Sequence, residues 1–225
     1  MARAFSRAVA MMAQDTSVPI SDPSVRHRLM AAATDLFNQK GYAGTSVREI
    51  VEEAGVTKPV LYYHFGSKEG IYLALFEETF AAFMDSLTVS SVHPNSARER
   101  ILDLCDRAYT FHAAHLPLVR LMYAIYYGPP QGAPPFDFEA THEVFQRLTA
   151  VIIEDGIRSG EIKPMPVPEA MWAVIGALNI AMEVDLCHPE QSLGREGLAR
   201  LLGTVFEGLA ASATPLKNAR KGARS

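Results

Sequence analysis

The chain has 225 residues, of which 48% are hydrophobic and 20% are charged, and its formal net charge is −4. This length and composition are typical of one or two globular domains that bury a core of their own. The slight acidity excludes a protein that binds nucleic acid through bulk positive charge, although a locally basic surface is compatible with it.

The cysteine count and the lengths of the apolar runs exclude further classes of protein. Cys105 and Cys187 show no paired spacing, so we expect buried, inert thiols and neither a disulfide framework nor a zinc site. The longest nearly apolar run, residues 170–178, is shorter than the roughly 18 residues that span a bilayer. The apolar patch at residues 8–13 is too short for a secretory signal. We therefore expect a cytoplasmic protein with no membrane partner.

The N-terminal part begins with residues 1–21, which lack a sustained period and are expected to form a flexible arm. Helical periodicity then starts at Asp22, a preferred N-cap, with Pro23 at the first helical position. This first helix is expected to end at Gly41 in a left-handed conformation.

Two short helices and a longer one follow. The second helix opens with Ser46, which has glutamate three residues later in the capping-box pattern, and Gly55 ends it. The third starts at Thr57 and has Pro59 in its first turn, where a missing N–H is tolerated. A glycine and a serine then precede a helix over residues 68–87.

The rest of the chain also predicts helices and no sheet, which makes the fold class all-α with about nine helices. Residues 128–135 hold several helix breakers and are expected to be a loop, either a plain connector or a gate. Residues 213–225 are expected to be a basic, disordered tail. The expected helices cover residues 96–115, 117–127, 138–158, 168–186 and 194–212.

The second and third helices, joined at Gly55, have the spacing of a helix-turn-helix. Reading DNA requires a helix whose exposed face carries donors and small apolar groups that reach base edges. Phosphate contacts come from helix N-termini, hydroxyls and cations. Side chains of both kinds occur here: Thr45, Ser46, Arg48, Thr57, Lys58, Pro59, Val60, Tyr62, Tyr63, His64 and Lys68.

Residues 24–76 resemble the N-terminal domain of TetR/AcrR-type transcriptional regulators. The segments that carry the resemblance are GYAGTSVREI at 41–50, AGVTK at 54–58 and LYYHFGSKE at 61–69. It implies a DNA-binding domain at residues 22–70, and an effector-binding and dimerisation domain at 71–212. The implied partners are a double-stranded DNA operator, a small-molecule effector and a second copy of the chain, with no metal or other cofactor.

The resemblance also implies roles for the candidate residues. Base contacts are expected from Lys58, Pro59 and Val60, and a guanine or backbone contact from Arg48. Phosphate contacts are expected from Thr45, Ser46, Tyr62, Tyr63, His64 and Lys68. Two alternatives stay open: Arg48 pairs with Glu52 at i+4, and Tyr62 is partly core. Family members often have Gly, Ala or Ser at position 59 and Thr or Ser at position 60, so the operator sequence is open.

The last two long helices carry the candidates for dimerisation, because relatives pair these helices into a four-helix bundle. The alternative is packing within one chain. The first helix has small residues at helical spacing and the second a row of large apolar ones. The interface candidates are Ala173, Gly176, Ala177, Ile180, Leu198, Leu202, Val205, Phe206 and Leu209.

Candidates for the effector site are aromatic, methionine or isolated polar residues in apolar helices, since polar groups there need a partner. His112 and His115 lie at i, i+3, but without a third ligand in view we expect no metal. The effector candidates are Phe83, Phe111, His115, Met122, Tyr126, Trp172, Asn179 and Glu183.

The sequence thus favours a homodimeric repressor that a small, largely apolar effector releases from a palindromic operator. An activator or a ligand-independent regulator of the same fold is the alternative. We do not expect an enzyme, because the sequence has no GxSxG, HExxH or phosphate-loop pattern. A protein-interaction module that keeps the helix-turn-helix as scaffold is a third reading.

Overall fold

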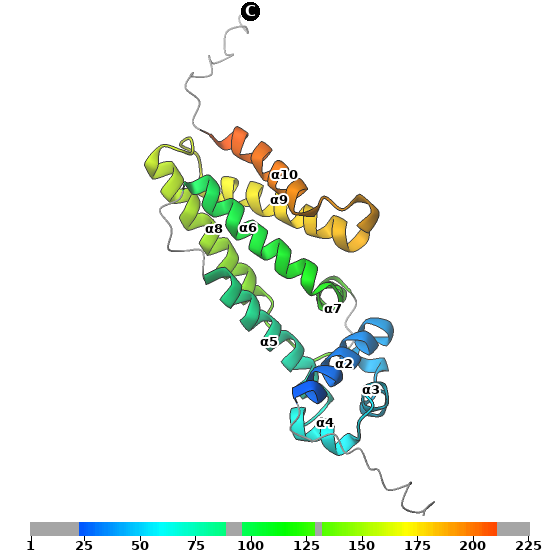
Figure 1. Cartoon of the computed structure of the whole chain (residues 1–225). Coiled ribbons are helices and arrows are strands. Elements are labelled where there is room, and N and C mark those ends of the chain that lie inside the picture. The colour runs from blue at the N-terminus through cyan, green and yellow to red at the C-terminus, as the bar shows by residue number, and fades with distance from the viewer. Residues whose placement is uncertain (1–22, 89–95, 129–131, 211–225) are drawn as a thin grey trace, which may run out of the picture. The chain divides into compact units, whose positions relative to one another are not determined.

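The computed structural model describes residues 23–88, 96–128 and 132–210 (Figure 1). These residues form nine α-helices and one short 3-10 helix, and they contain no β-strand. The all-α prediction is therefore confirmed. The expected arm at 1–21, the N-cap Asp22, the tail at 213–225 and part of the loop at 128–135 lie outside the described residues.

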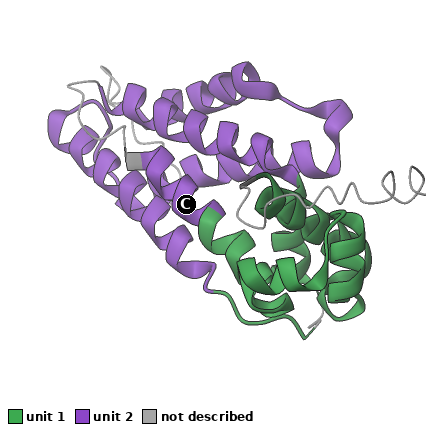
Figure 2. Ribbon diagram, turned by 60° about the horizontal axis from the view of Figure 1, so that its bottom comes forward, with its two compact units in different colours: residues 1–78, 117–136 green, residues 79–116, 137–225 purple. Residues whose placement is uncertain are grey.

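The chain divides into two compact units (Figure 2). Unit 1 comprises the residues up to Glu78 together with Pro117–Phe136, and unit 2 comprises Thr79–Leu116 and the residues from Asp137 onward. The helix-turn-helix thus lies in a compact unit larger than the expected domain of residues 22–70. The reason is that a segment distant in sequence, Pro117–Phe136, packs into it.

Unit 1 contains α2 (Pro23–Gly44), α3 (Val47–Glu53), α4 (Lys58–Phe65), the first half of α5 (Lys68–Thr88) and most of α7 (Leu116–Tyr127). Each helix contributes buried apolar side chains, as the periodicity predicts. Tyr72 is central, because its ring packs edge-on against other aromatic rings of the unit. The buried residues include Val25, Leu29, Phe37, Ile50, Leu61, Ile71 and Phe76.

Gly41 breaks the first helix, although not in the expected conformation. Its φ of 71° is positive, but its ψ of 168° lies outside the left-handed helical region. A further helical turn then continues to Gly44. Because L side chains avoid positive φ, glycine is favoured at this kink.

The helix-turn-helix has the local signals that the sequence predicts. Ser46 and Glu49 form a reciprocal capping box at the start of α3, and Thr57 is the N-cap of α4. Gly55 has a φ of 65°, a conformation that glycine adopts without steric cost. The turn between α3 and α4 is therefore specified by local sequence.

Unit 2 packs α6 (Ala97–Ala114), α8 (Glu139–Ser159), α9 (Val167–Cys187) and α10 (Gly194–Leu209) with the second half of α5. A 3-10 helix, η2 (Pro189–Gln191), lies between α9 and α10. The core includes Ile101, Leu104, Ile153, Val174, Leu178, Leu202 and Phe206.

The last helix ends at Leu209, three residues before the expected end. Ala210 pairs with Ile162 in an isolated antiparallel bridge, and the Lys163 N–H donates to the Leu209 carbonyl at 3.0 Å. The bridge therefore ties the end of α10 to the segment that follows α8.

Helix α9 is the one described helix that is long and apolar enough to cross a membrane, with a mean hydropathy of 1.5. The sequence reasoning missed it, because polar residues interrupt its apolar runs. Its Ala170, Val174 and Leu178 are buried in unit 2, and the helix packs against α8 and α10. Core packing therefore explains its composition.

The two cysteines differ in environment. Cys105 is buried, and burial raises the pKa of its thiol to about 12. Cys187, at the end of α9, is exposed. The expectation of two buried thiols is wrong for Cys187, because the last turn of α9 extends past the core.

Candidate nucleic-acid interface and ligand groove

Helix α4 presents one face to solvent and buries the other. Leu61 is fully buried and anchors the helix, whereas the side chain of Tyr63 is 65% exposed. Thr57, Lys58, Pro59 and Tyr62 are exposed as well, and at 49% exposure Tyr62 is still compatible with the expected alternative of a partly core side chain. This face holds a hydroxyl, a cation and two phenols, which are groups that contact phosphates and base edges.

His64 and Val60 turn partly away from that face. Both side chains are half-buried, and the Nε2 atom of His64 is buried without a hydrogen-bond partner in the described structure. The ring of His64 packs edge-on against Tyr63, with 5.1 Å between centroids. Nε2 of His64 is therefore not available to a phosphate in this structure, and the expected phosphate contact of His64 stays a prediction.

The N-terminus of α3 is held by a network around Glu49. The Ser46 N–H donates to Glu49 Oε2 at 2.8 Å, and Lys40 Nζ lies 2.6 Å from Glu49 Oε1. The hydrogen bond from Lys40, and then those from Ser46, lower the pKa of Glu49 to about 2. Ser46 is exposed and keeps its expected position at the helix N-terminus.

Thr45 holds the junction between α2 and α3 together. Its side chain is 2% exposed, and its Oγ1 lies 2.9 Å from the Gly41 carbonyl oxygen. Its backbone N–H donates to the Tyr42 carbonyl. The expected phosphate contact is therefore corrected, because both donors of Thr45 are used inside the chain.

Lys68 has a similar internal role. Its Nζ donates to the carbonyl oxygens of Tyr42 and Thr45, at 2.9 Å each, and lies 4.1 Å from the centroid of the Tyr42 ring. Lys68 thus has a role at the junction inside unit 1, and its expected phosphate contact stays a prediction. The ammonium group thus adds a donor to two carbonyl oxygens at the junction of α2 and α3.

Arg48 adopts the pairing that the sequence left open. Its Nε donates to Glu52 Oε1 at 2.6 Å, and this hydrogen bond to Glu52 raises the pKa of the guanidinium. The Arg48 side chain is exposed, so the pair contributes little to stability. A phosphate or a guanine can therefore compete for this guanidinium at small cost.

Arg26 on α2 supports the end of α4 from inside unit 1. The sequence reasoning missed this residue. Its guanidinium forms a two-point ion pair with Glu78 on α5 and lies 4.8 Å from the centroid of the Phe65 ring at the end of α4. The pair raises the pKa of Arg26. Arg26 and Glu78 are 52 positions apart, so no local pattern could reveal the contact.

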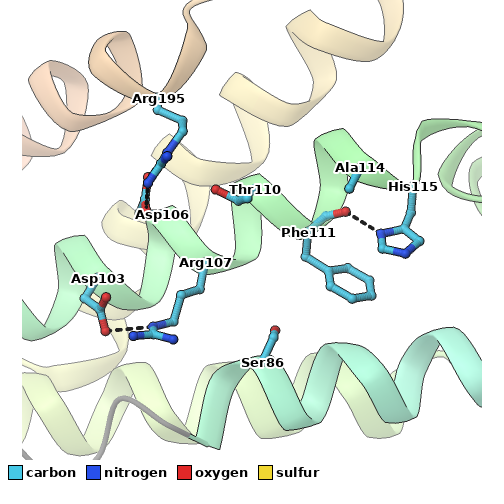
Figure 3. Close-up of a pocket in the computed structure, with 9 residues that line it drawn as sticks. All are labelled: Ser86, Asp103, Asp106, Arg107, Thr110, Phe111, Ala114, His115 and Arg195. Atoms are coloured by element: carbon cyan, nitrogen blue, oxygen red, sulfur yellow. Dashed lines mark hydrogen bonds and ion pairs between the residues drawn. The ribbon is translucent and has the colours of Figure 1, made fainter.

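Unit 2 contains a groove of about 470 Å³ along α6 (Figure 3). Helix α5 contributes Ser86 and α10 contributes Arg195. The remaining lining residues all come from α6 and its C-cap: Asp103, Asp106, Arg107, Thr110, Phe111, Ala114 and His115.

The groove has an aromatic part. The Phe111 ring stacks on the His115 ring with 4.0 Å between centroids, and it lies 5.2 Å from the Phe83 ring. The His115 Nδ1 atom is 2.8 Å from the Phe111 carbonyl oxygen. The structure thus brings together three of the expected effector residues.

The other expected effector residues do not join them. Met122 and Tyr126 belong to α7 in unit 1. Trp172, Asn179 and Glu183 lie on the exposed side of α9. None of these three lines the groove along α6, because α9 buries its opposite side.

The exposed side of α9 is apolar at its centre. Trp172 is 54% exposed and Ile180 is 48% exposed, and the small residues Ala173 and Gly176 lie between them. Large exposed apolar side chains grouped on one helix mark an interaction surface. Of the expected interface residues, Ala173, Gly176 and Ile180 are on this side.

The interface residues expected on α10 are mostly core. Leu198, Leu202, Phe206 and Leu209 are all buried within unit 2, as is Ala177 on α9. Val205 is half-buried against the same core. The expected apolar row of α10 is therefore corrected to intramolecular packing, the alternative that the pattern allowed.

Unit 2 also buries a polar pair between α6 and α9. The Nε2 atom of His112 and the Oδ1 atom of Asp185 are buried without a hydrogen-bond partner in the described structure. Burial lowers the pKa of His112, and the charge of Asp185 opposes that effect.

Comparison with known proteins supports the functional reading of unit 1. Residues 29–75 match the family model described as "Bacterial regulatory proteins, tetR family". The HTH-type transcriptional regulator YhgD of Bacillus subtilis, itself uncharacterized, is 30% identical over 199 residues, which cover 82% of this chain and 96% of that protein. The HTH-type transcriptional repressor SCO4008 of Streptomyces coelicolor is 26% identical over 165 residues, covering 72% and 81% of the two chains.

Solved structures show the same fold. The regulator FadR of Bacillus subtilis, in complex with stearoyl-CoA, superposes with a TM-score of 0.57 at 21% identity and covers 82% of this chain and 97% of that one. The matched residues 29–75 include α4, and the likeness to YhgD extends over most of both chains. Both findings are consistent with DNA binding through the exposed face of α4. The chain belongs to the tetR family of bacterial regulatory proteins and is a DNA-binding transcriptional regulator.

Proposed function

We propose that the protein is a homodimeric, cytoplasmic repressor that a small, largely apolar effector releases from a palindromic operator. The observation that carries the proposal is the exposed face of α4, where Thr57, Lys58, Pro59, Tyr62 and Tyr63 project from a helix anchored by Leu61. A helix with this distribution of groups fits a major groove.

Within this proposal Lys58 and Pro59 read bases, while Tyr62 and Tyr63 contact phosphates. Pro59 offers an apolar surface for a thymine methyl group, and Lys58 offers a donor for guanine. Ser46 and Arg48 add backbone contacts from α3. Thr45, Lys68 and Arg26 support these residues from inside unit 1 by fixing α2, α3 and α4 against one another.

Dimerisation through the exposed side of α9 supplies the second reading helix. A two-fold interface brings the same patch of both copies together, so Trp172, Ala173, Gly176 and Ile180 meet their equivalents. Asn179 and Glu183 flank this patch and contribute polar contacts. Small side chains in its middle permit close approach of two helices.

The effector is proposed to bind in unit 2, where the groove beside Phe111 combines aromatic and ionised side chains. The FadR regulator of Bacillus subtilis holds stearoyl-CoA in its crystal structure, which supports ligand binding in this fold. An effector releases DNA only by binding the DNA-free state more tightly than the DNA-bound one.

The test is a footprint and a titration on the DNA that flanks the gene of this protein, at fixed salt. A protected palindrome whose half-sites are about one or more helical turns apart is expected. Lys58→Ala should reduce affinity for that site, whereas Arg200→Ala, an exposed change on α10, should not.

Transcription from the protected promoter in vitro then gives the direction of control. Repression is the expected result, and stimulation would establish the activator alternative. Absence of binding to any operator-like or scrambled duplex, at low salt as well as high, would overturn the proposal.

A further inference from the structure

Two ion pairs line the groove of unit 2, one on the side of α6 that faces α5 and one on the side that faces α10 (Figure 3). On α6, Arg107 Nε donates to Asp103 Oδ2 at 2.9 Å. Between α6 and α10, Arg195 of α10 pairs through two nitrogens with Asp106, and the Nε–Oδ1 distance is 2.7 Å. Each ion pair is neutral as a whole, while its side chains stay partly open to solvent.

This arrangement disfavours a ligand that carries one sign of charge. An anion that reaches either arginine must approach the carboxylate already bound there, and a cation that reaches either aspartate meets an arginine in the same way. A ligand with both charges can place its cation on the aspartate and its anion on the arginine of one ion pair. Neither protein group is then left desolvated and unpaired.

The aromatic part of the groove lies one turn further along the same side of α6. Arg107 and Phe111 are four residues apart, about 6 Å along the helix axis, and both side chains point toward α5 (Figure 3). The side chain of an aromatic amino acid bridges a distance of this order between its charged groups and its ring. The Phe111 and His115 rings, already stacked, continue the surface on which a third ring can lie.

We propose that this groove binds an aromatic zwitterion of the amino-acid type, with its ammonium group on Asp103, its carboxylate on Arg107 and its ring against Phe111. The inference deepens the proposed function, on which it rests, by naming the chemical class of the effector. The ring accounts for the largely apolar character, and the zwitterionic head matches the Asp103–Arg107 ion pair.

Calorimetric titration of the full chain with three probes tests the class of ligand without DNA. The probes are L-tryptophan, indole-3-propionate and tryptamine, which share one ring and differ in charge. L-tryptophan is expected to bind at least tenfold more tightly than either singly charged probe. Equal or tighter binding of a singly charged probe, or binding of none of the three, would overturn the proposal.

Two variants locate the site. Arg107→Gln should weaken L-tryptophan binding at least tenfold. Arg200→Gln should leave it unchanged, because Arg200 pairs with Glu196 at the same i, i+4 spacing but outside the groove. Phe111→Leu keeps an apolar side chain and should weaken binding while the thermal midpoint stays within a few degrees. Equal loss in the Arg200→Gln control would contradict the assignment.

Release of DNA is measured separately, so that failure of the proposed ligand class can be distinguished from failure of the proposed repressor function. L-tryptophan that binds the groove and also lowers operator affinity supports both. Binding without any change in operator affinity supports the ligand class and overturns release by this ligand.

Discussion

The ammonium group of Lys68 lies over the ring of Tyr42 and donates a hydrogen bond to the carbonyl oxygen of the same residue. A second hydrogen bond, to Thr45, joins the end of α2 to the start of α3. One cation at the start of α5 thus holds the junction from which α3 and α4 project. Its effect on DNA binding is therefore expected to pass through the fold of unit 1.

Replacing Lys68 should cost stability as well as affinity. Lys68→Met removes two charge-assisted hydrogen bonds from a half-buried position, and we expect the free energy of unfolding to fall by about 2 kcal/mol. Urea unfolding followed by circular dichroism measures it. Lys58→Met is the control, since an exposed change should alter stability by less than about 0.5 kcal/mol. If Lys68→Met left stability unchanged but weakened DNA binding, Lys68 would act by direct contact with a phosphate and not through the fold of unit 1.

Lys58 and Tyr63 should affect DNA binding in different ways. Lys58→Ala is expected to lower operator affinity, to relax base preference and to reduce the slope of log K against log salt by about one. Tyr63→Phe removes a hydroxyl and should weaken operator and scrambled DNA equally, with the salt slope unchanged. Anisotropy titrations at several salt concentrations separate the two. If both variants behaved identically, the assignment of base contacts to Lys58 and phosphate contacts to Tyr63 would be refuted.

The exposed side of α9 should control the oligomeric state. Ile180→Glu places a charge at the centre of the apolar patch and is expected to give monomers that lose operator binding. Val151→Glu on α8 is the matched control, because Val151 is 49% exposed and Ile180 48%. Light scattering coupled to gel filtration gives the mass of each. Dimers in both variants would exclude this side of α9 as the interface.

Burial of His112 should make unit 2 less stable in mild acid. The pKa of His112 is lower in the folded chain than its ordinary value of 6.5, so the unfolded chain binds a proton first as the pH falls. The contribution of neutral His112 to the free energy of unfolding is therefore complete above about pH 6.5. It decreases as the pH falls from 6.5 to the lower pKa of the folded chain.

Urea midpoints at pH 7.5 and 5.5 test this effect. His112→Gln should lose less stability between the two pH values than the unaltered protein. His188→Gln should behave like the unaltered protein, because His188 is exposed. A His112→Gln variant with the full pH dependence would show that another group is responsible.

Local signals account for most of what the sequence predicted correctly. The Ser46 and Glu49 box, the glycine at 55 and the N-cap Thr57 act within three or four residues, so their structure follows from their spacing. The exposed face of α4 follows in the same way once Leu61 is recognised as core.

Contacts between distant segments explain the corrections. Lys68 carries a group suited to phosphate, yet it donates to carbonyls 26 and 23 positions away at the α2–α3 junction. Thr45 differs, because its hydroxyl turns back on the carbonyl of Gly41, four residues away. On α9 and α10 both sides are partly apolar, so periodicity alone could not decide which side the chain buries. The structure assigns Leu202 to the core and leaves Ile180 exposed.

The contrast between the two cysteines makes the protein easy to label. A thiol reacts as thiolate, and Cys105 is both buried and shifted to a high pKa, so a maleimide dye should attach to Cys187 alone. That residue ends the helix whose exposed side is the proposed dimer contact. One dye per chain, without any added cysteine, would therefore report subunit exchange and the separation of two copies by energy transfer.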